Sequence, residues 1–335
     1  MLRYLVSRVL QAAGVLWAAF TVSFVVLYLI PGDPVAQAAS VPGVPLDAAA
    51  VAELHARYGL DRPLWAQYLT ALEHAVTLDL GRSLETGQPV TQAIAQVLPA
   101  TLELAGSALV LGTLFGGGLA VAAAYTRSRW LRGLLTALPS AGSAAPTFWT
   151  GLLLLQLFSF RLRLVPAFGG HGVAGTILPA ITLAIPVGSG IGQVLYSSLA
   201  QTWRQPFVAI AFAKGGSRWW VQLRHVLRPA AVPALAVTGV WVGVVLSGSV
   251  VVETVFSRPG IGRLTQDAVE HHDIPVVLGV VMLTASAFVL AGLAVDLLLP
   301  VVDPRARRVV RRRAERPVDA AATPIRPLHP EQVAA

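Results

Sequence analysis

Charged residues and cysteine are the scarce components of this 335-residue sequence. Cysteine is absent, which excludes disulfides, thiolate metal sites and thiol nucleophiles. Only 13% of the residues are charged and 55% are hydrophobic, which is too much apolar surface for a soluble domain of this size. The single lysine, Lys214, stands in Ala-Lys-Gly-Gly, which is not a phosphate-binding loop. The composition therefore predicts a membrane protein without a nucleotide site of its own.

Long apolar runs set the predicted topology. A helix needs about 20 apolar residues to cross a hydrocarbon core of about 30 Å. The first run is too long for the apolar region of a secretory signal, about 7–15 residues, so we expect it to be retained. We predict an all-α polytopic membrane protein with six transmembrane helices. The predicted spans are 9–30, 101–125, 133–160, 177–200, 232–252 and 276–301.

Basic residues gather on one side of these spans. If the N-terminus is cytoplasmic, 18 of the 25 Lys and Arg residues lie on the cytoplasmic side and seven lie outside. Because Lys and Arg accumulate in cytoplasmic loops, both termini are predicted to be cytoplasmic. This bias also accounts for most of the net charge of +8, so the charge gives little support to nucleic-acid binding.

Two segments outside the spans have their own character. Residues 31–98 contain amphipathic patches at 46–58 and 64–75, which predict a small external helical cap. Residues 304–335 are rich in Arg, Pro and Ala without apolar periodicity, which predicts a disordered basic cytoplasmic tail lying near anionic lipids. The residues expected to form turns in the cap are Gly81, Gly87 and Pro89.

The segment 201–231 is basic, although it lies between two long apolar runs. It contains a short apolar stretch, 206–213, predicted to be a helix that the glycines at 215 and 216 bring to an end. Exposed Phe207, Val208, Ile210, Ala211 and Phe212 would let this helix dock in a groove of another protein. The alternative is an amphipathic segment lying on lipid. The residues expected to serve the docking are Phe207, Val208, Ala211, Phe212, Ala213, Lys214, Gly215, Arg224 and His225.

Short blocks at the ends of the spans form an ordered series. They are Ile30-Pro-Gly-Asp-Pro34, Gly59-Leu-Asp-Arg-Pro63, Asp79-Leu-Gly-Arg-Ser83, Leu98-Pro-Ala-Thr-Leu-Glu-Leu-Ala105, Val252-Glu-Thr-Val-Phe-Ser-Arg-Pro-Gly-Ile-Gly262 and Leu298-Leu-Pro-Val-Val-Asp-Pro-Arg305. Together with the segment 201–231, they resemble the inner-membrane permease subunits of ATP-binding-cassette (ABC) importers of the dipeptide, oligopeptide and nickel type. The resemblance covers the chain from Met1 to about Arg308.

This resemblance implies a type I ABC importer permease fold. Residues 1–30 would be the first span, 31–98 the external cap, 99–303 a five-helix permease core, and 201–231 its coupling loop. The chain would be a transport subunit, not an enzyme, in the plasma membrane of a bacterium. It would form half of a translocation pathway for short peptides.

The resemblance also implies partners. They are a second homologous permease subunit, two ATP-binding-cassette ATPase subunits, and an external solute-binding protein that docks on the cap and on the loop 254–275. This chain would bind no cofactor itself, because ATP and Mg would bind the ATPases. Nickel or another small solute is the alternative cargo. An ion-coupled secondary transporter is the alternative mechanism, although it should show an internal repeat and midplane charges, and neither is evident.

Three further groups of residues invite a functional interpretation. Glu270-His-His-Asp273 has the atoms to hold a divalent metal, but adjacent histidines are more often polar surface, so we predict no metal site; the candidates are His271, His272 and Asp273. Glu103 and Asp296 lie near span ends, where helix packing or subunit contact is expected rather than proton transfer. The run Gly116-Gly-Gly118 predicts a close contact between helices.

Overall fold

The structure is a computed structural model that describes residues 2–29, 61–167 and 172–302. The regular secondary structure of these residues is helical, apart from one isolated β-bridge between Arg82 and Pro89. The long helices are α1 (Leu2–Leu29), α5 (Val90–Tyr125), α8 (Val173–Thr202), α11 (Leu227–Val255) and α13 (Ile274–Val302). The shorter ones are α4 (Leu64–Thr77), α6 (Arg129–Ala144), α7 (Thr147–Leu154), α9 (Pro206–Ala213), α10 (Arg218–Val221), α12 (Ile261–Glu270) and the π-helical turns η1 (Leu155–Arg161) and η2 (Gln222–Val226).

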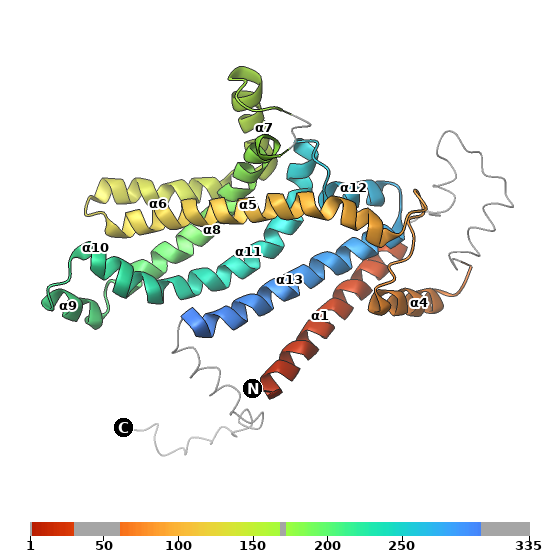
Figure 1. Ribbon diagram of the computed structural model, residues 1–335, viewed down its shortest axis with the longest axis horizontal. Coiled ribbons are helices and arrows are strands. Elements are labelled where there is room, and N and C mark those ends of the chain that lie inside the picture. Colours follow the sequence, from red (N-terminus) through yellow and green to blue (C-terminus); the bar gives the residue numbers. More distant parts are fainter. Residues whose placement is uncertain (1, 30–60, 168–171, 303–335) are drawn as a thin grey trace, which may run out of the picture.

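The long helices confirm the predicted fold class. In the described part of the chain, five helices are long and apolar enough to cross a membrane. A bent pair made of α6 with α7 and η1 would supply a sixth crossing. The long helices run side by side (Figure 1). Among the shorter helices, α9 and α10 lie at one end of the bundle and α4 and α12 lie at the other (Figure 1).

The third predicted span, 133–160, is wrong as a single helix. Its two halves meet at an angle of 104°. The break falls at Ala145, whose backbone is extended (φ −81, ψ 128) because the ring of Pro146 disfavours a helical conformation in the residue before it. Three other prolines of the third and fourth predicted spans lie inside continuous helices: Pro139, Pro179 and Pro186.

The second span begins earlier than predicted. α5 starts at Val90, so the predicted cap boundary at residue 98 falls inside this helix. Val90 and Ile94 are buried, and they share an apolar cluster with Val276 and Val280 of α13. The apolar positions of this first part of α5 therefore continue the helix, and Pro99 does not interrupt it.

Glycines bring α5 and α8 into backbone contact. A methyl group on Gly116 would stand 2.0 Å from the carbonyl oxygen of Gly188, and one on Gly192 would stand 2.9 Å from the carbonyl oxygen of Gly116. Gly112 lies one turn before Gly116 and meets Val187 in the same way. The helices thus use the small-xxx-small spacing that permits close approach in membranes. The packing prediction is confirmed for the first glycine of the run 116–118.

The segment predicted to form the external cap is described in part. α4 confirms the second amphipathic patch, while the first, 46–58, lies outside the described residues, as does the tail 304–335. Gly81 (φ 75) and Gly87 (φ 67) adopt left-handed backbone conformations that favour glycine, as expected of turns. The hairpin between them places Ser83 against the start of α13, where its hydroxyl donates to Asp273.

Candidate functional site

The short helix predicted at 206–213 is present as α9, with Pro206 in its first turn, where a missing N–H costs nothing. Its end is a Schellman motif. Gly215 is left-handed (φ 81) and its N–H donates to the Phe212 carbonyl at 2.9 Å, while the Gly216 N–H donates to the Ala211 carbonyl at 3.1 Å. The glycine pair therefore ends the helix as predicted and turns the chain back towards the bundle.

Two of the residues expected on the exposed side of α9 are buried. Val208 is 3% exposed and Ala211 is 7% exposed, and both belong to the main core of the bundle, so the prediction of their exposure is wrong. The outward side consists of Phe207, Ile210 and Phe212, at 36%, 56% and 41%. Because all eight residues of α9 are apolar, the sequence shows no contrast from which the buried side could be assigned.

Aromatic contacts attach α9 to the ends of α5 and α8. The ring of Phe212 stacks on Trp203, with centroids 6.1 Å apart. The Arg218 guanidinium lies 5.5 Å from the Trp203 ring and 5.4 Å from the ring of Tyr125, the last residue of α5. Trp219 meets Tyr125 edge-on at 5.5 Å. Cation–π contacts of this kind hold the basic residue and both helix ends together.

A buried glutamine completes the attachment. Gln222, in η2, is fully buried, and its Nε2 donates to the Val121 carbonyl of α5 at 2.8 Å. Since α10, η2 and α11 follow one another without a gap, these contacts connect the segment around α9 to α5, α8 and α11. The sequence prediction missed Gln222, Trp203 and Tyr125; the only signal was a glutamine set among apolar residues.

A groove of about 750 Å³ lies beside α9. Its lining includes Phe207 and Ile210 of α9, Trp220, His225 and the basic residue Lys214. The rings of Trp220 and His225 are in edge-to-face contact at 4.6 Å. Gly215 also lines the groove, and the other predicted docking residues, Ala213 and Arg224, are exposed. A groove lined by apolar side chains and a lysine suits an apolar side chain next to an acidic group.

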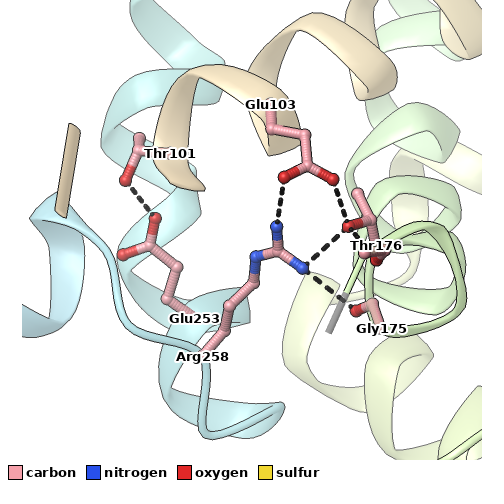
Figure 2. A network of polar contacts seen from close by, with 7 residues as sticks. Thr101, Glu103, Gly175, Thr176, Glu253 and Arg258 are labelled. Atoms are coloured by element: carbon pink, nitrogen blue, oxygen red, sulfur yellow. Dashed lines mark hydrogen bonds and ion pairs between the residues drawn. The ribbon is translucent and has the colours of Figure 1, made fainter. Parts of the chain in front are cut away.

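At the opposite end of the bundle, the Glu253 side chain of α11 faces Thr101 of α5 (Figure 2). Its carboxylate is fully buried, and it accepts the Thr101 hydroxyl at 2.7 Å, the Gly262 N–H at 2.7 Å and the Arg263 N–H at 3.2 Å. Thr101 in turn accepts the Ile261 N–H at 2.8 Å. These are the amides that an N-cap side chain would satisfy, so a residue of α11 caps α12 from outside. We call this arrangement the Glu253 clasp.

The clasp explains why glycines follow Pro259. A methyl group on Gly260 would stand 2.2 Å from the Glu253 carboxylate, and one on Gly262 would stand 2.3 Å from Cα of Val250. Only glycine lets the chain pass this close to the carboxylate and to α11. The last part of the block 252–262 is therefore required by the capping of α12.

An ion pair lies next to the clasp (Figure 2). Arg258 meets Glu103 of α5 at 3.2 Å, and also donates to the Thr176 hydroxyl at 2.9 Å and to the Gly175 carbonyl at 3.2 Å. The Thr176 hydroxyl donates to Glu103 at 2.6 Å. Glu103 thus serves contacts between helices, as predicted. The side chain of Asp296 lies outside the described residues.

Two of the residues considered for a metal site, Asp273 and His271, have other partners, whereas no described residue forms a hydrogen bond with the buried Nδ1 of His272. Asp273 is 2% exposed and accepts the Ser83 hydroxyl, while its carbonyl begins the hydrogen bonding of α13. His271 Nδ1 lies 2.8 Å from the Asp267 carbonyl and 3.7 Å from the Glu85 carboxylate. Both contacts, the carbonyl first, raise the pKa of His271 above its ordinary value. Across the described ranges, no three His, Asp or Glu side chains are grouped to hold a metal ion.

Comparisons with known proteins agree on one family. The family of binding-protein-dependent transport system inner membrane components matches residues 112–308, and the N-terminal part of such components matches residues 1–105. The chain is 36% identical to the glutathione transport system permease protein GsiC of Salmonella paratyphi A over 307 residues, which is 92% of this chain and 99% of the relative. GsiC of Escherichia coli (strain K12) is 34% identical over the same shares.

A solved amino acid ABC transporter, crystallised with histidines, has a TM-score of 0.46 and 17% identity, covering 64% of this chain and 94% of the solved one. The two family matches together leave little beyond the tail unmatched, and the relatives match almost from end to end. The chain therefore belongs to the binding-protein-dependent inner membrane components, the permease subunits of ABC importers of the peptide type, which work with separate ATPase and binding-protein subunits and are not themselves enzymes.

Proposed function

We propose that this chain forms half of an ATP-driven pathway for short peptides or peptide-like solutes, and that α9 couples it to an ATPase subunit. The feature that carries the proposal is that one side of α9 is buried and the other is exposed. Val208 and Ala211 fix the helix in the bundle, while Phe207 and Ile210 face outward beside the groove. An apolar helix side presented in this way is suited to docking in a groove of another protein.

Membership of the family supports a proposal for the remaining partners. We propose a second homologous permease subunit, two ATPases that bind ATP and Mg, and an external solute-binding protein that docks at the end carrying α12 and α4. The cytoplasmic side would be the end with α9, where the turn between α5 and α6 also brings Arg127, Arg129 and Arg132 (Figure 1). Both chain termini would then be cytoplasmic.

The proposed mechanism is a two-state switch. When two ATPases close on ATP, they would draw the two α9 helices together, and hydrolysis would release them. Because Gln222 and the Trp203 and Tyr125 contacts join α9 to three long helices, the motion would turn the bundle as a body rather than bend α9 alone. The solute would be handed over by the binding protein while the bundle is open to the outside.

The cargo proposal rests on the names of the relatives. Glutathione is a small peptide, and the relatives named for its transport match nearly the full length of this chain. Nickel is the alternative cargo, because the sequence resembles permeases of the dipeptide, oligopeptide and nickel type.

Two measurements test the proposed function. Membrane co-purification with mass spectrometry should recover two ATPases and a second permease with the chain. Proteoliposomes containing that assembly and its binding protein should accumulate glutathione or a dipeptide when supplied with ATP. Accumulation of nickel alone would overturn the peptide cargo. Recovery of the chain without any ATPase would overturn the coupling.

A further inference from the structure

One side of α4 is apolar and is not covered by any described part of the chain. Trp65 is 68% exposed, Leu69 is 54% exposed and Val76 is 77% exposed. Residues spaced four and seven apart lie on one side of a helix, so these three side chains form a continuous stripe. Three large apolar residues in a row facing water would be unfavourable.

A second side of α4 packs against α1. Tyr68 lies 5.3 Å from the ring of Phe24 and 5.9 Å from the ring of Phe20, measured between centroids. Its hydroxyl is 2.8 Å from the Thr21 hydroxyl, and Ala75 is buried in the same cluster. These contacts fix how α4 is rotated about its own axis, and therefore where the apolar stripe points.

The third side of α4 is polar. Glu73 and His74 are exposed on it, and Thr70 and Thr77 follow the same three- and four-residue spacing. Around its circumference, α4 thus shows a side packed on protein, an uncovered apolar side and a polar side. That order is expected of a helix lying along a membrane surface beside a transmembrane bundle.

Two long helices indicate the level of α4 along the bundle. α1 runs to Leu29, and Phe24 and Phe20 lie about 8 Å and about 14 Å before that residue along the helix axis. α13 begins at Ile274, and Leu278, which joins the same cluster, lies about 6 Å from that end of the helix. α4 therefore packs against the end regions of two long apolar helices, which is where a helix lying at a membrane surface is expected.

From these observations we propose that α4 is an interfacial helix whose Trp65, Leu69 and Val76 insert among phospholipid acyl chains. Tryptophan is favoured at this level of the membrane, and Glu73 and His74 keep the opposite side in water. A soluble solute-binding protein would have to enter the hydrocarbon to reach the stripe. Placing α4 in the outer leaflet rests on the proposed function, whereas its insertion in lipid does not.

The natural absence of cysteine makes a direct test simple. Leu69→Cys and Val76→Cys, each labelled with bimane in the full complex, are reconstituted in phosphatidylcholine and phosphatidylglycerol vesicles. His74→Cys on the polar side is the matched control. Brominated lipids should quench the labels at 69 and 76 about twofold and iodide should leave them unchanged, with the reverse at 74.

Two results would overturn the proposal. Iodide quenching at 69 and 76 equal to that at 74 would mean that the stripe faces water. Protection from both quenchers would mean that protein covers it. The leaflet is tested separately, with a membrane-impermeant maleimide on His74→Cys in right-side-out vesicles. Failure to react there, but reaction in inverted vesicles, would contradict the proposed orientation while leaving insertion in lipid intact.

Discussion

Removing the Glu253 carboxylate should loosen α12 far more than any other single side-chain change near it. Glu253→Ala takes away the acceptor of three hydrogen bonds and leaves the amides of Gly262 and Arg263 without a partner. A hydrogen bond to a charged acceptor contributes about 1.5–3 kcal/mol, so losing the two amide bonds costs about 3–6 kcal/mol. Since about 1.4 kcal/mol corresponds to a factor of ten, local opening of the first turn of α12 should become at least about 100-fold more frequent.

Hydrogen exchange followed by mass spectrometry measures this opening. Peptides that cover 260–266 should exchange at least about 100-fold faster in Glu253→Ala, while peptides from α9 should not change. Glu253→Gln keeps the shape and one acceptor oxygen, so it should fall between the two. Glu270→Ala, at the exposed C-terminal end of the same helix, is the control. Unchanged exchange at 262 and 263 in Glu253→Ala would refute the capping argument.

Three further predictions concern other contacts. Gly116→Leu should force α5 and α8 apart and lower the thermal unfolding midpoint of the detergent-solubilised protein by several degrees, and an unchanged midpoint would contradict the backbone contact. A double-mutant cycle on Arg258 and Glu103 should give a coupling of about 1 kcal/mol or less, because Glu103 is half exposed, and a coupling several times larger would contradict that estimate. The pKa of His271 is raised above its ordinary value of 6.5, first by the Asp267 carbonyl and then by the Glu85 carboxylate. The attraction between His271 and Glu85 is therefore complete below pH 6.5, where the imidazole is charged, and is lost as the pH rises through the raised pKa. Glu85→Gln should lower the His271 pKa seen by NMR of ring-labelled histidine, and no change would rule out the Glu85 contribution.

Sequence periodicity and composition were sufficient for the fold class, because each span needs only its own apolar residues. Helix α9 was also predictable from its own residues, because Pro206 begins it and the glycines at 215 and 216 end it. The burial of Val208 and Ala211 was not predictable, since it depends on which side of a uniformly apolar helix meets the bundle. The break before Pro146 was missed, because the apolar residues of the predicted span 133–160 continue on both sides of it.

The Glu253 clasp shows a different limit. The block 252–262 was recognisable as a motif, but the reason for it is not contained in the block. Thr101, whose hydroxyl donates to the Glu253 carboxylate, is 152 residues away in the sequence. The other donors are main-chain amides, which every residue except proline has, so the residue types do not reveal them. Gln222 is similar, because its partner is a carbonyl 101 residues earlier. Contacts of this kind require the tertiary structure.

The central claim is that the outward side of α9 holds an ATPase, and selective loss of that partner tests it most directly. Phe207→Asp with Ile210→Asp alters exposed side chains and leaves Val208 and Ala211 in the core. Val269→Asp, an exposed apolar position of α12 at the other end, is the control. We predict that the α9 double variant co-purifies with the second permease but without the ATPases, and that the control retains both. Wild-type recovery of the ATPases by the double variant would contradict the account.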